Sequence, residues 1–98
     1  MNKYVESVRS FQADGIWVIS NCFPEKNKHR KGRSVVFVEK MKVGKPCWWI
    51  YSTAYNQAPH DSFGKIVSTS AIEDIKIAYN GDIQLSTKNS QYMFRRML

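Results

Sequence analysis

The stretch of sequence that decides the fold is IKIAYNGDIQLSTKNSQYMFRRM, residues Ile75–Met97. Apolar and polar side chains alternate along it, and the turn-forming dipeptides Asn80-Gly81 and Asn89-Ser90 interrupt the alternation. Alternation with a period of two is typical of strands that bury one face. The stretch therefore predicts three consecutive antiparallel strands joined by two tight turns.

The position of the first turn follows from which residues must share a face. A two-residue turn at Asn80-Gly81 would put the apolar side chains of the two strands on opposite faces. A three-residue loop over residues 80–82 pairs Tyr79 with Ile83 and keeps both on one face. A tight turn at Asn89-Ser90 then continues that face into the third strand and pairs Tyr92 with Thr87. The predicted core face consists of Ile77, Tyr79, Ile83, Leu85, Tyr92 and Phe94.

Shorter apolar runs upstream predict the other strands: Ile16–Phe23, Val35–Val38, Cys47–Tyr51 and Lys65–Ser70. Pro24 ends the first run, and Thr69 or Ser70 begins a turn after the last. The run at Cys47 is apolar on both faces, which predicts a central strand. Residues 52–63 read as a long loop. Five to six short strands at this spacing predict a small antiparallel barrel or curved sheet, of SH3-like or OB-like size.

The first dozen residues predict a different element. Tyr4, Val5, Val8 and Phe11 recur at helical spacing, with polar residues between them, so we expect a short amphipathic helix. The predicted fold class is thus mainly β within α+β. A chain of 98 residues has room for one hydrophobic core, so residues 1–98 are expected to form a single domain.

The charge balance narrows the class of partner. Fifteen Lys and Arg residues against eight Asp and Glu give a formal net charge of +7. Such an excess attracts nucleic acid, an acidic protein or an anionic membrane surface, although it also serves solubility alone. No apolar run approaches the roughly 20 residues that span a bilayer. The first nine residues lack the apolar stretch of a secretory signal, so a cytoplasmic location without membrane association is expected, with Cys22 and Cys47 as free thiols.

The segment from Lys26 to Arg33 carries the strongest functional signal. It lacks apolar side chains and holds five cations in eight positions, namely Lys26, Lys28, Arg30, Lys31 and Arg33. Clustered cations on an exposed connection contact phosphates without demanding exact geometry. A solvated hairpin loop is the alternative interpretation. Three further cations, Lys76, Lys88 and Arg95, are expected on the polar face of the C-terminal strands.

Aromatic side chains near these cations would strengthen a nucleic-acid hypothesis, because unpaired bases stack on exposed rings. The candidates are Trp48, Trp49, Tyr51 and Tyr55. Adjacent strand residues point to opposite faces, so the two tryptophans fill one core only if the strand is covered on both sides. Either one of them is exposed, or the N-terminal helix covers the outer one.

Motifs for catalysis or metal binding are weak. The four residues that could supply zinc ligands lack the short spacing of zinc sites; they are Cys22, His29, Cys47 and His60. His60-Asp61-Ser62 juxtaposes the residue types of a catalytic triad, but triad partners meet across a fold and gain nothing from adjacency. Glu73-Asp74 would diverge on a strand. We therefore predict no enzymatic activity, no metal and no cofactor.

Two segments carry a resemblance. Residues 64–72, GKIVSTSAI, followed by residues 87–92, TKNSQY, resemble the tail of short uncharacterised phage-encoded proteins, which place Thr-Ser before an apolar pair and end in T-x-N-S-x-Y. The resemblance covers about the last third of the chain. It implies a phage accessory protein made in the host cytoplasm, of the size of inhibitors of host nucleases, polymerases or CRISPR effectors. Many such inhibitors are acidic DNA mimics, whereas this chain is basic, which excludes mimicry.

Two functional hypotheses follow. The first is a non-catalytic protein that binds DNA or RNA through the segment from Lys26 to Arg33, helped by the face that carries Lys76, Lys88 and Arg95. The alternative is a stoichiometric inhibitor that occludes the surface of an acidic host protein, for example an anti-CRISPR protein. The oligomeric state is left open.

Overall fold

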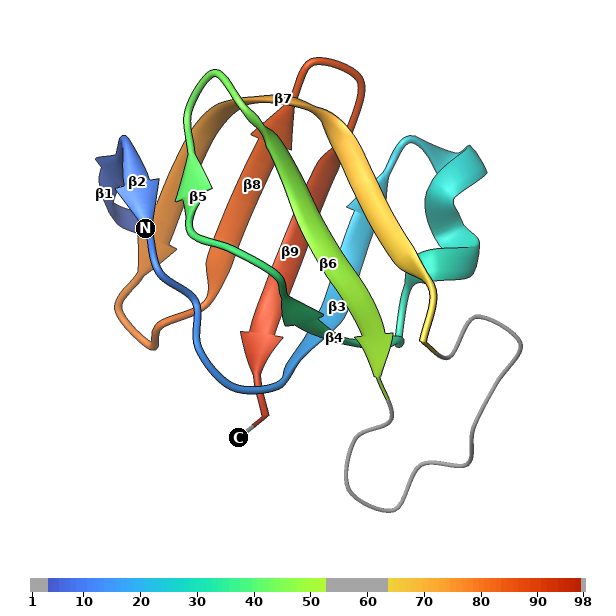
Figure 1. Ribbon diagram of the computed structural model, residues 1–98. Helices are drawn as coiled ribbons and strands as arrows, with labels where there is room; N and C mark the ends of the chain where they lie inside the picture. The colour runs from blue at the N-terminus through green and yellow to red at the C-terminus, as the bar shows by residue number, and fades with distance from the viewer. Residues whose placement is uncertain (1–3, 53–63, 98) are drawn as a thin grey trace.

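The structure, a computed structural model, describes residues 4–52 and 64–97 (Figure 1). Apart from one short 3-10 helix, its regular elements are strands. In chain order they are β1 (Tyr4–Val8), β2 (Ser10–Phe11), β3 (Trp17–Phe23), the 3-10 helix η1 (Glu25–Arg30), β4 (Ser34–Phe37), β5 (Met41–Lys42), β6 (Pro46–Ser52), β7 (Ile66–Ala78), β8 (Ile83–Thr87) and β9 (Gln91–Arg96).

Six strands close into an antiparallel barrel in the order β7-β6-β4-β3-β9-β8, with β8 pairing back onto β7. β7 makes this closure because it is long. It arches across the molecule in Figure 1, pairing with β6 through its first half and with β8 through its second. The predicted turn at Thr69 or Ser70 is therefore wrong, since β7 runs on through both residues. The prediction of a small, mainly β barrel is confirmed.

The β7–β8 hairpin has a three-residue loop, but it lies one residue earlier than predicted. Ile77 rather than Tyr79 lies opposite Ile83, so the loop is Tyr79-Asn80-Gly81. The last residue of such a loop adopts a positive φ, and Gly81 does so at 89°. Tyr79 therefore leaves the core and is 83% exposed.

The β8–β9 turn is shifted in the same way. It occupies Lys88-Asn89 instead of Asn89-Ser90, because the Thr87 N–H donates to the Ser90 carbonyl at 2.8 Å. The Thr87 hydroxyl also contacts both the N–H and the carbonyl of Ser90, each at 3.1 Å. Moving a turn by one residue moves the strand register by two, so the same side chains still point into the core. Of the predicted core, Ile77 is half-buried, and the fully buried residues are Ile83, Leu85, Tyr92 and Phe94.

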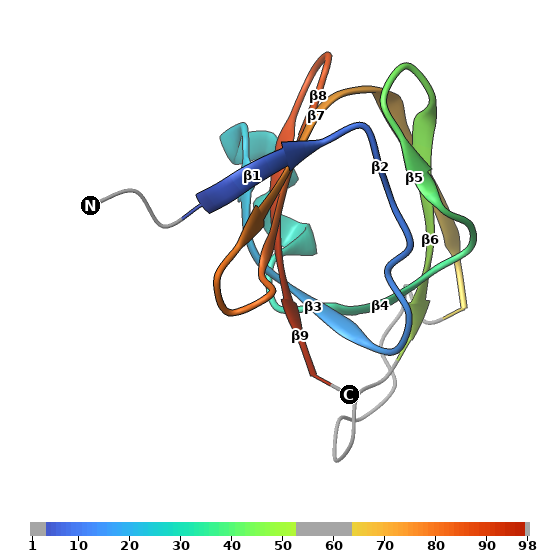
Figure 2. The same ribbon diagram turned by 90° about the vertical axis from the view of Figure 1, so that its left-hand side faces the viewer.

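The predicted N-terminal helix is wrong, because these residues form β1 and β2. Val8 lies opposite Ile75 of β7, and Phe11 lies opposite Met41 of β5. Figure 2 shows β1 beside β7, with β2 continuing towards β5. A bulge after Tyr4 and the break between the two strands replace strict alternation by spacings of three and four residues, which a helix also shows.

Aromatic rings fill the barrel. The Trp49 ring centroid lies 5.2 Å from that of Tyr92 and 5.6 Å from that of Phe94, both edge-to-face, and Phe37 approaches Phe94 to 4.9 Å. Such pairs stabilise a core beyond the area that they bury. Because large side chains occupy the interior, groups that could meet a partner lie on the outside of the barrel.

Candidate nucleic-acid interface

The cationic segment, residues 26–33, has a defined structure on the barrel. Pro24 ends β3, and the 3-10 helix η1 follows it directly. The Asn27 N–H donates to the Pro24 carbonyl at 2.9 Å. After the helix, the Gly32 N–H donates to the Ile19 carbonyl of β3 at 2.8 Å. The segment therefore lies against β3 instead of extending freely into solvent.

Asn27 anchors the middle of η1. Its side chain is buried, with 8% of the residue exposed, although the sequence predicted a wholly exposed connection. Its Nδ2 atom donates to the Ser90 hydroxyl at 2.9 Å, and its backbone carbonyl accepts from the Cys22 Sγ at 3.1 Å. A buried amide must find such partners, since an unpaired one would be costly. The contact ties η1 to the β8–β9 turn.

Two arginines of the segment rest on tyrosines of the barrel. Arg30 Nη1 donates to the Tyr92 hydroxyl at 2.6 Å, and its guanidinium carbon lies 6.0 Å from that ring's centroid. The guanidinium of Arg33 lies 5.8 Å from the Tyr51 ring centroid. Burial raises the pKa of Tyr51, and the two guanidinium charges counteract part of that rise. Both arginines thus help to hold the segment while keeping their charge half-exposed.

The lysines of the segment point to solvent. Lys28 forms an ion pair with Glu25 at 3.4 Å, but both side chains are largely exposed and such pairs contribute little. Lys26 and Lys31 are exposed and have no ion-pair partner among residues 4–52 and 64–97. The ammonium groups of the segment are therefore available to an anionic ligand.

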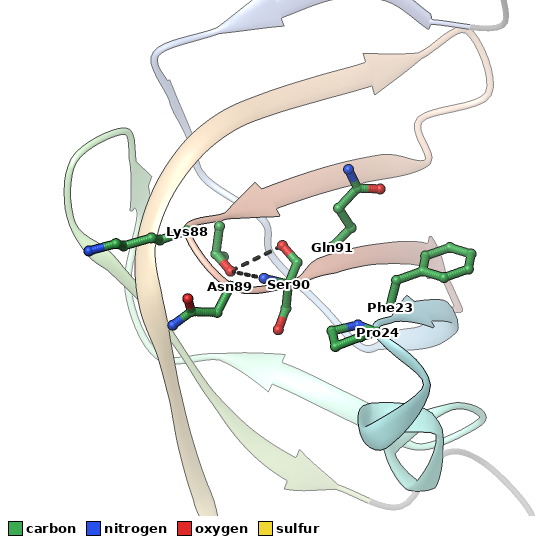
Figure 3. A pocket seen from close by; sticks show the side chains of 7 residues that line it. Phe23, Pro24, Lys88, Asn89, Ser90 and Gln91 are labelled. Carbon is green, nitrogen blue, oxygen red and sulfur yellow. Dashed lines mark hydrogen bonds between the residues drawn. The ribbon is translucent and has the colours of Figure 1, made fainter.

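Of the second group of predicted cations, Lys76 and Arg95 lie on the outer face of β7, β8 and β9, which Gln84 and Met93 share, and Lys88 lies apart from them. Lys76 is 3.8 Å from the Asp74 carboxylate, and Arg95 is 3.8 Å from that of Asp82. Lys88 instead occupies the β8–β9 turn, which Asn27 links to η1. The Lys88 side chain points away from η1 (Figure 3), so its charge lies on the other side of this contact, while carboxylates offset the charges of Lys76 and Arg95 on the barrel wall.

A hollow of about 410 Å³ separates the start of η1 from the β8–β9 turn (Figure 3). Its walls consist of Phe23, Pro24, Thr87, Lys88, Asn89, Ser90 and Gln91. The hollow is wide open to solvent and combines one aromatic ring with several amide and hydroxyl groups. In Figure 3, the Lys88 side chain points away from the other residues, so its charge lies outside the hollow.

The four predicted aromatic contacts have different outcomes. Trp48 is 39% exposed, Trp49 and Tyr51 are buried in the core, and Tyr55 lies outside the described residues. The alternative in which a helix covers the outer tryptophan is wrong. Sequence reasoning missed Phe23, which is 50% exposed. Its signal was its place beside Pro24, immediately before the cationic run.

Trp48 belongs to an apolar outer face of β4, β6 and β7. Val36, Ile50 and Ile66 lie opposite one another in one row across the three strands. The Val38 N–H donates to the Trp48 carbonyl at 3.0 Å, which puts these two residues in the next row. We call these five residues the apolar outer face. Contiguous exposed apolar residues commonly mark a protein contact.

Neither of the two cysteines, both of which lie among the described residues, is activated as a nucleophile. Cys22 and Cys47 are buried free thiols, and burial raises the pKa of both, that of Cys47 to about 12. A thiol that holds its proton is a poor nucleophile. No group of three or more His, Cys, Asp or Glu side chains could hold a metal ion in these parts of the chain. The His60-Asp61-Ser62 stretch lies outside them.

Comparisons with known proteins give no functional information about this surface. No protein-family model, curated protein or solved structure matches the chain. None of the helices in the described ranges is long and apolar enough to cross a membrane. The functional argument therefore depends on the chemistry of the surface itself.

Proposed function

We propose that the protein binds nucleic acid, without catalysis, through the cationic segment together with Lys88. The observation that carries the proposal is the anchoring of η1 by Asn27 and Arg30, which presents the ammonium groups of Lys26 and Lys31 to solvent from a fixed support. Ordered cations lose less conformational entropy when they meet phosphates than cations on a free loop. In this proposal Lys76 and Arg95 contribute only to the long-range field.

The chemistry of this surface is better suited to binding than to catalysis. Phosphate recognition needs clustered cations and no activated nucleophile, whereas both described thiols hold their protons. The proposal covers DNA and RNA alike, since both present the same phosphate backbone. It is also compatible with a phage accessory protein that acts in the host cytoplasm.

The test is the salt dependence of binding to DNA and RNA oligonucleotides. The variant Lys26→Gln/Lys31→Gln removes two phosphate contacts and should lower the slope of log Kd against log salt by about 1.4 for a single strand. The matched control, Lys76→Gln/Arg95→Gln, changes the net charge equally and should leave the slope nearly unchanged. Absence of binding at low ionic strength would overturn the proposal, and so would equal effects of the two variants.

The apolar outer face favours a second candidate, inhibition of an acidic host protein by surface occlusion. Exposed lysines adjoin it in the sequence: Lys65 precedes Ile66, Lys45 precedes β6, and Lys40 follows Val38 by two residues, with one carboxylate, Glu39, between them. An apolar centre with a cationic rim is complementary to an acidic protein that carries exposed apolar residues. That complementarity, and not the apolar face alone, supports an acidic protein as the partner.

The test of this candidate starts from nuclease-treated bacterial lysate and three baits: the wild-type chain, Val38→Glu and Lys26→Gln/Lys31→Gln. Support requires a protein that the wild type and the lysine variant capture equally, that Val38→Glu fails to capture, and that binds at one-to-one stoichiometry when purified. Capture that Val38→Glu does not weaken contradicts the second candidate.

A further inference from the structure

We propose that the hollow between Phe23 and the β8–β9 turn receives an unpaired base of a single-stranded nucleic acid, which stacks on the Phe23 ring. This inference rests on the proposed function and assigns it a class of ligand. It also accounts for a group of side chains that the cationic segment alone leaves without a role.

Phe23 has an unusual position for a phenylalanine. It is the last residue of β3, and because Cys22 points into the core, its ring points outward. Gln91 is its partner across the strands, and half of the residue remains exposed. Pro24 follows it and turns the chain into η1, so no further strand residue covers the ring. An exposed ring at the edge of a cationic surface is the usual platform for a stacked base.

Unused hydrogen-bonding groups line the same hollow. The side-chain amides of Asn89 and Gln91 have no hydrogen-bond partner within the described parts of the chain. The Ser90 hydroxyl accepts a bond from Asn27, which leaves its own proton available. An amide offers both a donor and an acceptor, which is what the Watson–Crick edge of a base requires. In a duplex that edge is already occupied by the opposite strand.

The surrounding charges fit a backbone that runs past the hollow. Lys88 points away from it in Figure 3, towards solvent, and the cationic segment begins two residues after Pro24. A base inserted at Phe23 would leave its phosphates outside the hollow, between Lys88 on one side and the cationic segment on the other. A duplex cannot bind in this way, because each of its bases is stacked on both faces. The hollow therefore selects single strands, while the cations alone would not discriminate.

The experiment measures fluorescence anisotropy with four labelled probes of about 12 nucleotides, a length within the range of small single-strand binders. They are single-stranded DNA, single-stranded RNA of the same sequence, the DNA duplex, and an abasic DNA strand with the same number of phosphates. The wild type should bind at least one of the two single strands about 10-fold more tightly than both the abasic strand and the duplex.

Variants separate stacking from charge. Phe23→Ala should lose the 10-fold preference while its Kd for the abasic strand stays the same, and Phe23→Tyr should restore the preference. Gln91→Ala, which leaves the ring in place, should weaken only the binding of strands with bases. The matched control is Tyr79→Ala, which removes another exposed ring at the opposite end of β8 and should change nothing.

The outcomes distinguish the two proposals. If no probe binds, the proposed function fails and the inference fails with it. If the wild type binds all four probes equally, or if Phe23→Ala retains the preference for bases, the cationic surface stands and the base site is overturned. Tighter binding of the duplex than of either single strand also overturns it.

Discussion

The contact between Arg30 and Tyr92 gives the most direct test of how the barrel holds its cationic surface. Tyr92→Phe removes the hydroxyl that accepts the Arg30 hydrogen bond at 2.6 Å. It keeps the buried ring, which packs 5.2 Å from Trp49 between centroids and 6.1 Å from Phe94. The change therefore isolates one hydrogen bond without opening a cavity.

The expected loss is about 1 to 1.5 kcal/mol in the free energy of unfolding. A hydrogen bond to a charged group contributes about 1.5 to 3 kcal/mol. The lower part of that range, or slightly less, applies here because Arg30 is only half-buried and can regain water, and because its contact with the ring face persists. For a domain of this size, 1 kcal/mol lowers Tm by about 4 to 8 °C.

Urea unfolding, followed by tryptophan fluorescence, measures the loss, and a double-mutant cycle with Arg30→Gln assigns it to the pair. The coupling free energy should be about 1 kcal/mol, with unchanged m-values. Tyr79→Phe serves as the control, because the Tyr79 hydroxyl belongs to an exposed turn residue. A coupling free energy of zero would refute the anchoring of the segment by Arg30.

Two further predictions concern backbone strain and pH. Gly81→Ala places a side chain at a φ of 89°, where the backbone is strained although the added Cβ meets no atom within 4 Å. Urea titrations should show a free energy of unfolding lower by about 1 kcal/mol. An unchanged free energy of unfolding would contradict the loop Tyr79-Asn80-Gly81. Burial raises the pKa of Cys47 to about 12 in the folded protein, whereas the pKa of an unfolded thiol is near 9.0. The free energy of unfolding should therefore fall as pH rises from about 9 to 12, and Cys47→Ser should make that fall smaller. An identical pH profile for the variant would contradict the burial of this thiol.

The alternation of apolar and polar side chains made the barrel predictable, but it did not determine the exact positions of the turns. Moving a hairpin loop by one residue shifts the register by two, so Leu85 and Phe94 reach the core in either case. The φ requirement at Gly81 decided the loop position, and Tyr79 was misassigned because its alternation continues into the turn. β1 was misassigned because its spacing contains a bulge and its partner lies about 70 residues away.

The sequence predicts the charge of the candidate site but not how its residues are arranged in space. The five clustered cations can be read directly from the sequence. Their anchors cannot, since Asn27 meets Ser90 and Arg30 meets Tyr92 across separations of 63 and 62 residues. The same holds for the hollow between Phe23 and the β8–β9 turn, whose two walls become neighbours only when β3 pairs with β9.

The pairing of β9 between β3 and β8 also bears on how the chain folds during synthesis. β3 is made early, yet its long partner is the last strand of the barrel, and β8 needs the same strand on its other side. Closure must await the emergence of β9 from the ribosome, since non-local pairing cannot be completed before both partners are free. Until then, the aromatic residues of the core remain exposed to chaperones and proteases, and the cationic segment lacks the Tyr92 that holds Arg30. The cationic surface and the barrel are therefore completed at the same moment, with the arrival of one strand.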